Sequence, residues 1–353
     1  MPQLFADCLN EILEYLEGDM ITLYSCLLVN HLWCEISVRI FWRNSWDYNY
    51  SNLRTLISCL PTESKEILSK NGIIISTSTS KPPMFNYASF CKGLSINRVD
   101  YKLKQILRNQ QSVSLQNLNN NTYILAQELY KLFFSQGSLK ILDLYLDRNF
   151  NFYPGAKECL KNLSELRCKP AVLSSEILYQ LSQTCHNILS LDITVDRVIS
   201  KELTDLISAQ KNLKHLDIKC FCTEGGLKDV ISSLTNPNKI TKLCLYTTFH
   251  CFSLSFIIEF TNLQELELDF DYDECFKDFE KLQYAFFPKL QILKIEYGCP
   301  KYELLIKFLE KNGKNLRECY ISYCKYNGDV NLLKLAITEF CPNLKKFFIR
   351  NRV

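Results

Sequence analysis

The stretch Leu213-Lys-His-Leu-Asp-Ile218 recurs as Leu263-Gln-Glu-Leu-Glu-Leu268, and both fit the phrase L-x-x-L-x-L. Copies start at Leu139, Leu163, Ile188, Leu213, Ile240, Leu263, Leu290, Leu316 and Leu344, at intervals of 23 to 28 residues. The first, fourth and sixth positions of every copy are apolar if Cys is counted. A regular period of this length predicts a repeat architecture.

Each phrase predicts one short strand with two faces. Positions four and six lie on the same side of a strand, while the residues between them face the other way. One strand of this length cannot bury its own apolar side, so neighbouring copies must stack. Leu94-Ser95-Ile96 forms an additional, imperfect strand in this interpretation.

The segments between the phrases predict helices, because apolar residues recur three and four positions apart. Four segments show this pattern: Ser174–Gln183, Lys201–Gln210, Tyr302–Lys311 and Asn331–Phe340. The chain therefore resembles the leucine-rich repeats, and this resemblance implies an α/β solenoid with a curved parallel sheet and helices on its convex side. Cys91, Cys185 and Cys341 precede their phrases by three residues, as in the cysteine-containing subclass, and Cys324 follows Ile321 by three.

The N-terminal segment predicts three short helices that precede the repeats. Apolar residues of the first, Leu9, Ile12, Leu13 and Leu16, have helical spacing, and Asp19 is a candidate N-cap for the second. Such a unit can bury little apolar surface alone. We therefore expect boundaries at 1–46 for this module, 47–89 for a helical connector with a loop at 76–83, and 90–353 for the repeats.

The same segment resembles an F-box. The matching positions are Leu4, Ile12, Leu13, Leu16, Val29, Trp33 and Trp42, and Phe5 stands where the family usually has Pro. The resemblance implies binding to the Skp adaptor of a cullin-based ubiquitin ligase, and Phe5 and Leu9 complete the predicted adaptor-binding set. An alternative interpretation is that these helices only cap the open end of the solenoid.

Composition argues against several functions. Residues 1–40 carry a net charge of −5, against +3 for the whole chain, and we expect no nucleic-acid partner. No apolar run reaches the roughly 18 residues that span a bilayer, and the acidic N-terminus lacks a secretory signal. Seventeen scattered Cys predict reduced thiols in the cytoplasm or nucleus.

No catalytic motif is present, so we expect a non-enzymatic protein without cofactor or metal. A calcium loop was considered at Asp269, Asp271, Asp273 and Glu280, but Glu274 stands where such a loop needs Gly. Outward-facing strand residues instead suggest a target-binding surface, and these are Glu265, Glu267, Asp269, Lys294, Phe348 and Arg350. The sequence thus predicts the substrate receptor of an SCF-type E3 ubiquitin ligase, or alternatively a repeat scaffold without a ligase role.

Overall fold

The structure is a computed structural model that describes residues 5–75, 83–110, 115–145, 153–196, 199–221, 226–248, 253–323 and 328–351. The chain forms two compact units, Met1–Leu163 and Ser164–Val353. The predicted boundaries at residues 46 and 89 therefore fall inside the first unit. Most of the predicted loop, residues 76–82, lies outside the described residues.

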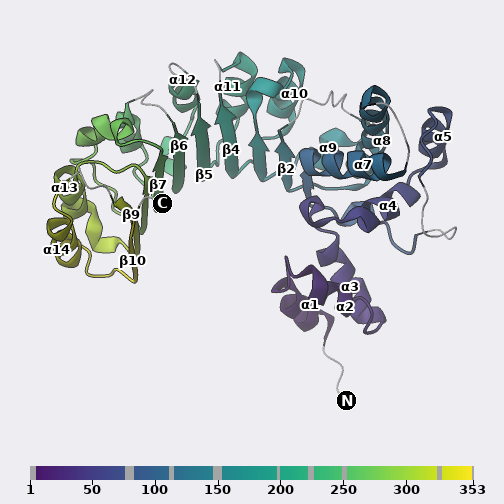
Figure 1. The fold of residues 1–353 in the computed structure, drawn as a ribbon, viewed down its shortest axis with the longest axis horizontal. Helices are drawn as coiled ribbons and strands as arrows, with labels where there is room; N and C mark the ends of the chain where they lie inside the picture. The colour runs from purple at the N-terminus through teal and green to yellow at the C-terminus, as the bar shows by residue number, and fades with distance from the viewer. Residues whose placement is uncertain are drawn as a thin grey trace. The chain divides into compact units, whose positions relative to one another are not determined.

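The first unit begins with the three predicted helices (Figure 1). These are α1 (Ala6–Glu14), α2 (Met20–Cys26) and α3 (His31–Phe41). Asp19 and Asn30 cap α2 and α3 by accepting hydrogen bonds from the backbone N–H groups of Thr22 (3.1 Å) and Trp33 (3.0 Å). Phe5, the N-cap of α1, has a φ of −61°, a value that Pro would also allow.

A partly buried ion pair links the C-terminal ends of α1 and α3. The Arg43 guanidinium donates to both carboxylate oxygens of Glu14 at 2.6 Å, and it also lies 3.2 Å from Glu17. Hydrogen bonding to Arg43 lowers the pKa of Glu14. Bidentate pairs of this kind fix orientation as well as adding stability.

The remaining elements of the first unit are helical apart from two short strands. They are α4 (Tyr50–Ser58), α5 (Thr62–Lys70), α6 (Tyr87–Phe90), β1 (Gly93–Ser95), α7 (Ile96–Gln110), α8 (Leu115–Gln136), β2 (Ile141–Leu144) and α9 (Ala156–Leu160). Strand β1, the predicted imperfect strand, pairs in parallel with β2.

The segment that follows α3 covers the outer edge of β1. The Arg43 carbonyl accepts hydrogen bonds from the N–H groups of Lys92 (2.7 Å) and Gly93 (3.0 Å), and the Ser45 hydroxyl accepts one from Ser95 (2.7 Å). A Cβ at Gly93 would collide with the Trp46 ring, so only glycine permits this approach. The N-terminal helices are thereby joined to the first strand.

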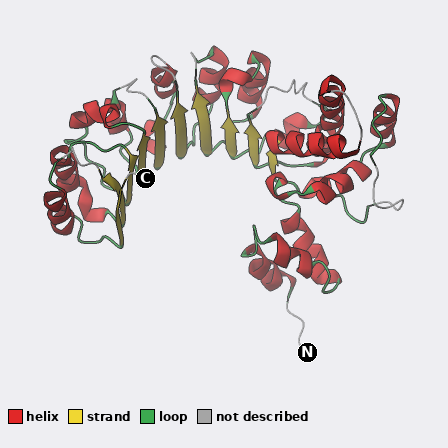
Figure 2. Ribbon diagram, in the orientation of Figure 1, coloured by secondary structure: helices red, strands yellow, loops and turns green. Residues whose placement is uncertain are grey.

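The second unit contains eight strands that pair in parallel in chain order (Figure 2). They are β3 (Glu165–Cys168), β4 (Ser190–Val195), β5 (His215–Cys220), β6 (Lys242–Thr247), β7 (Glu265–Phe270), β8 (Ile292–Tyr297), β9 (Glu318–Tyr323) and β10 (Lys346–Asn351). In register, Leu191, Leu216, Leu243, Leu266 and Leu293 form one buried row. The predicted leucine-rich-repeat stacking is thereby confirmed.

Helices run along the outer side of these strands (Figure 2). The four predicted helices are present as α10 (Ser175–Thr184), α11 (Lys201–Ser208), α13 (Tyr302–Asn312) and α14 (Val330–Phe340), and α12 spans Gly226–Ser232. Short 3-10 helices replace them between β6 and β8, at Leu254–Glu259 and Asp273–Lys281. The length of each connection thus varies while the strand register stays constant.

Buried amides link successive repeats beneath the helices. The Gln210 side chain donates to the Cys185 carbonyl at 2.6 Å and accepts from the Ile188 N–H at 3.0 Å. The Asn312 side chain forms the same kind of bridge to the Ala285 carbonyl (2.9 Å) and the Phe287 N–H (2.7 Å). These side chains satisfy backbone groups that would otherwise be buried without partners.

Every cysteine among the described residues is a free thiol, and most are buried. Cys185 and Cys341, from the predicted cysteine positions, end α10 and α14. Burial raises the pKa of Cys185 to about 12 and that of Cys341 to about 11. They act as small apolar side chains, while Cys324 lies outside the described residues.

The last repeat is more open than those before it. Leu344, Phe347 and Ile349 are only partly buried, although the equivalent residues of the preceding repeat, Leu316 and Cys319, are fully buried. No following strand in the described part of the chain covers them.

We expect Leu216→Ala to lower the free energy of unfolding by about 2 to 5 kcal/mol, since it leaves a cavity in the leucine row. Chemical denaturation of the full chain measures this loss. Leu335→Ala, on the exposed face of α14, is the matched control and should change stability by less than about 0.5 kcal/mol. An unaffected Leu216→Ala variant would contradict the stacked core.

Candidate functional site

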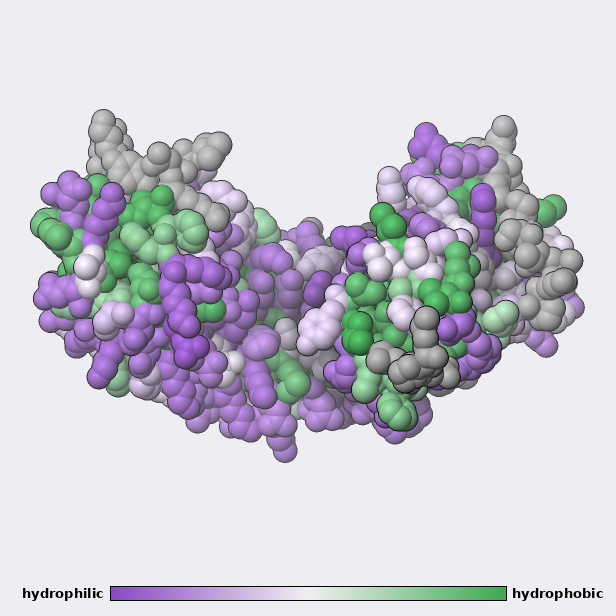
Figure 3. Space-filling view, turned by 90° about the horizontal axis from the view of Figure 1, so that it is seen from below, coloured by the Kyte–Doolittle hydropathy of each residue, from purple (hydrophilic) through white to green (hydrophobic). Residues whose placement is uncertain are grey.

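Two stripes of exposed apolar side chains lie on the N-terminal helices. On α1 the stripe comprises Phe5, Cys8, Ile12 and Tyr15; on α2 and the turn after it the stripe comprises Ile21, Tyr24 and Leu28. Ile21 is 83% exposed and Leu28 is 74% exposed. Figure 3 shows apolar residues gathered around these helices. Exposed apolar patches on folded domains mark interaction surfaces more often than accidents of sequence.

The predicted adaptor-binding residues divide into two groups. Phe5, Ile12 and Val29 are exposed, and Leu16 and Trp33 are partly buried, so these side chains are accessible to a partner. Leu9, Leu13 and Trp42 are buried in the helical core, and they act by holding the accessible residues in place. Leu4 lies outside the described residues.

The F-box resemblance predicted only part of this surface. Ile21, Tyr24 and Leu28 lie at positions i, i+3 and i+7, a spacing that predicts one helical face. That spacing does not reveal whether the face is buried or exposed. The buried face of α2 consists of Leu23 and Cys26.

The second candidate surface is the outward face of β3–β10, made of the strand residues that point away from the helices. The register places three parallel rows across it. The middle row reads Arg167, Asp192, Asp217, Cys244, Glu267, Lys294, Tyr320 and Phe348. Glu265 lies in the row before it, and Asp269 in the row after it.

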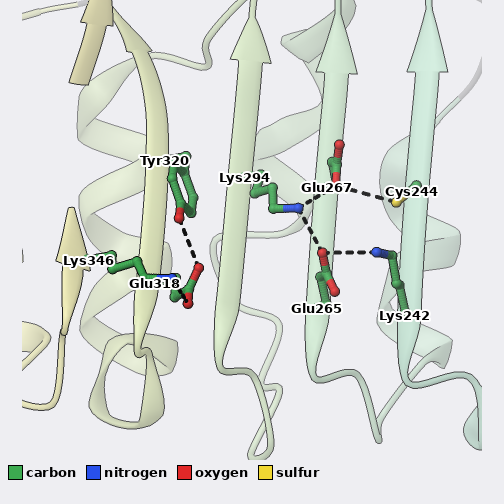
Figure 4. Close-up of polar contacts among 8 residues, drawn as sticks. All are labelled: Lys242, Cys244, Glu265, Glu267, Lys294, Glu318, Tyr320 and Lys346. Carbon is green, nitrogen blue, oxygen red and sulfur yellow. Dashed lines mark hydrogen bonds and ion pairs between the residues drawn. The ribbon is translucent and has the colours of Figure 1, made fainter. Parts of the chain in front are cut away.

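Lys294 neutralises much of the predicted acidic patch. Its ammonium group lies 2.9 Å from a carboxylate oxygen of Glu265 and 2.9 Å from one of Glu267, and Lys242 lies 3.2 Å from Glu265 (Figure 4). These hydrogen bonds raise the pKa of Lys294 despite its partial burial. Glu265 and Glu267 therefore already have cationic partners within the chain.

Asp217 and Asp269, in contrast, form no ion pair with any cation that the structure describes. Burial, together with Asp192 near Asp217 and Glu296 near Asp269, raises the pKa of each carboxyl to about 6. One oxygen of Asp269 is buried without a hydrogen-bond partner among the described residues. The sequence predicted Asp269 but not Asp217 as a target-binding residue. The balance of charge around each carboxyl depends on which strands lie next to each other.

The far end of the outward face carries aromatic side chains. The rings of Tyr320 and Phe348 stack with their centroids 5.4 Å apart and an interplanar angle of 12°. Glu318 accepts a hydrogen bond from the Tyr320 hydroxyl at 2.9 Å and pairs with Lys346 at 2.9 Å (Figure 4). Strand β10 includes Arg350, whose side chain lies outside the described part.

A shallow pocket of about 570 Å³ opens on this face over β3–β8. Charged residues of both signs line it, among them Asp192, His215, Asp217 and Lys242. Within the described residues no group of three or more His, Cys, Asp or Glu side chains is placed to hold a metal ion, and the candidate calcium residue Asp273 instead accepts a hydrogen bond from the Cys299 N–H at 2.9 Å. No described helix is both long and apolar enough to cross a bilayer.

Comparisons with known proteins find a distant likeness among solved structures and no match among sequences. No family model matches the chain, and no curated protein sequence matches it. Among solved structures, it is similar to the leucine-rich repeat-containing protein LegL7 from Legionella pneumophila, at 16% identity and a TM-score of 0.34, over 60% of this chain and 83% of that one. So distant a likeness carries no functional argument. The leucine-rich-repeat class rests on the paired strands and the buried leucine row described above.

We expect Asp217→Asn to raise the free energy of unfolding at pH 7 by about 1 kcal/mol. A pKa shift of about two units corresponds to about 3 kcal/mol, and solvent screening reduces this value for a half-buried group. The folded state binds more protons than the unfolded state between about pH 4 and pH 6, so wild-type stability falls as pH rises through this window. The benefit of the substitution should therefore disappear below about pH 4.

Denaturant titrations at several pH values test this expectation. Asp205→Asn, at an exposed position on α11, is the matched control and should show no such pH-dependent gain. Parallel pH profiles for wild type and Asp217→Asn would contradict the assignment.

Proposed function

We propose that this chain is the substrate-recognition subunit of an SCF-type E3 ubiquitin ligase. In this proposal α1–α3 bind a Skp adaptor, and through it a cullin, while the repeats bind a target protein. The chain itself performs no bond chemistry and acts by bringing the target close to the ubiquitin-carrying enzyme. The observation that carries the proposal is an F-box-like module whose apolar stripes stay exposed.

The energetics of the stripes favour a protein partner. Full burial of one large apolar side chain contributes about 1.5 to 3 kcal/mol, so covering Phe5, Ile12, Ile21 and Leu28 would offset much of the cost of association. The stripes lie on helices whose ends are fixed by the Arg43–Glu14 pair. A rigid surface loses little conformational entropy when it binds.

The target surface in this proposal is the outward face around Asp217 and Asp269. A segment of the target that carries Lys or Arg would give these carboxylates the direct ion pair that they do not form with the described residues. Its binding would lower their raised pKa values and release protons near pH 6. The stacked Tyr320 and Phe348 rings provide an apolar contact next to this surface.

We expect the double variant Ile12→Glu, Leu28→Glu to lose binding to the Skp adaptor, since two exposed anchors become charged. Loss of central apolar anchors costs about 2 kcal/mol or more at each site, which corresponds to at least about thirtyfold. Co-purification and calorimetry with a purified adaptor measure this change. Ile74→Glu, at a residue that is 74% exposed on the same unit, is the control.

Leu13→Asp is a poor test, because Leu13 is 1% exposed and its substitution would unfold the module. The proposal fails if the wild-type chain does not bind the adaptor, or if the Ile12, Leu28 double variant binds as well as the wild type. A circular dichroism melt of each variant establishes that the fold is retained.

The second candidate is a repeat scaffold whose N-terminal helices only cap the solenoid. The observation in its favour is the set of hydrogen bonds that Arg43 and Ser45 accept from backbone N–H groups at the edge of β1. A cap predicts that deletion of residues 1–46 lowers the stability of the first unit, with no adaptor bound in the wild type. A ligase subunit predicts adaptor binding whatever the effect of the deletion.

A further inference from the structure

A band of positive charge lies along the edge where the strands of the second unit begin. This basic edge consists of the residues just before and after the first apolar residue of each phrase, from the repeat at Ile188 to the repeat at Leu344. No acidic residue occupies the two positions before that residue or the one after it in these repeats. The cations there, all exposed, are Lys211, Lys214, Lys239, Lys289, Lys314, Arg317 and Lys345.

Part of the basic edge has a structural role. Several side chains that immediately precede a phrase donate to a backbone carbonyl of the preceding repeat, as Asn262 does to Asn238 (2.8 Å) and Asn343 does to Lys314 (2.8 Å). Lys239 makes the corresponding bond to the Lys211 carbonyl at 3.0 Å. These contacts tie repeat to repeat and account for Lys239 and the asparagines.

The other six cations have no such role. None of their side chains forms a hydrogen bond or ion pair with any residue that the structure describes. The nearest carboxylates along the strands, Glu265 and Glu318, are paired with Lys242, Lys294 and Lys346. The charge of the basic edge is therefore not neutralised within the described chain.

A groove of about 640 Å³ opens on the same edge. Its lining includes Lys214, Lys239 and Lys289 together with Asn and Gln side chains, and it contains no carboxylate. Figure 3 looks onto the edge at which the strands begin, where hydrophilic residues predominate. Ammonium groups next to amides suit a ligand that has both carboxylates and a peptide backbone.

We propose that the basic edge binds an extended, Asp- and Glu-rich segment of a partner protein. An extended chain advances about 3.3 to 3.6 Å per residue, and adjacent strands are about 4.8 Å apart, so roughly three residues span two repeats. Carboxylates two residues apart are then about 7 Å apart, a distance between those that span one and two repeats, and the flexible lysine side chains can take up the difference. Single-stranded nucleic acid fits less well, because the edge positions have no Phe, Tyr or Trp side chain on which bases could stack.

This surface differs from the adaptor stripes and from the outward face, so it does not depend on the ligase proposal. Its test uses the full chain and a fluorescein-labelled peptide of about ten residues that alternates Glu and Ser, followed by anisotropy. The matched peptide has Gln in place of Glu. We expect binding of the Glu peptide only, weakened by added salt because the cations are exposed.

The variant Lys214→Glu, Lys289→Glu, Lys345→Glu should bind the Glu peptide at least about tenfold more weakly. The control Lys228→Glu, Lys307→Glu, Lys334→Glu makes the same change of net charge at exposed positions on α12, α13 and α14, and its affinity should change less than about twofold. Gln at the three edge positions provides a milder variant if the Glu variant does not fold.

Three outcomes would overturn the proposal. Equal losses of affinity in the edge and helix variants would show that only the net charge of the chain matters. Equal binding of the Glu and Gln peptides, or no binding of either, would show that the edge does not recognise carboxylates. Tighter binding of an RNA or DNA oligonucleotide that depends on the same three lysines would assign the edge to a nucleic acid.

Discussion

The structure depends on the burial of one apolar row by stacking strand against strand. A six-residue strand such as His215–Cys220 cannot cover Leu216 and Ile218 by itself, and the parallel neighbours β4 and β6 complete the cover. Because the contacts repeat, connections of different length and helix type are tolerated as long as register is kept. The same register also aligns the outward side chains into rows, so surface chemistry follows from core packing.

The sequence predicts the stacked strands and their helices better than the irregular connections and the division into two units. The nine phrases and the four amphipathic segments were enough to predict strands, helices and stacking, because periodicity is a local property of the chain. The 3-10 helix at Asp273–Lys281 was not among the predicted helices, although Phe276, Phe279 and Leu282 recur every three residues, which is the period of a 3-10 helix. The division at Leu163 has no local signal.

Candidate sites were harder to predict than the fold. Four of the positions that resemble the F-box pattern, Ile12, Leu16, Val29 and Trp33, are at least partly accessible, but Leu13 and Trp42 are not. On the strands, alternation predicted that Glu265 and Glu267 face outward, yet it could not show that Lys294 lies between them. Charge compensation requires knowledge of cross-strand neighbours, and that knowledge comes only with the register.

The incomplete burial of Leu344, Phe347 and Ile349 leaves the β10 end of the second unit less well packed than its centre. A repeat array loses structure most easily where a repeat has a single neighbour, and β10 pairs only with β9 among the described strands, so we expect opening to start at β10 and spread toward β9. Amide hydrogens of β10 should then exchange before those of β5 and β6, and the stacked Tyr320 and Phe348 rings separate in the first step. Order in this unit is therefore graded along the chain, with the most persistent backbone in its centre.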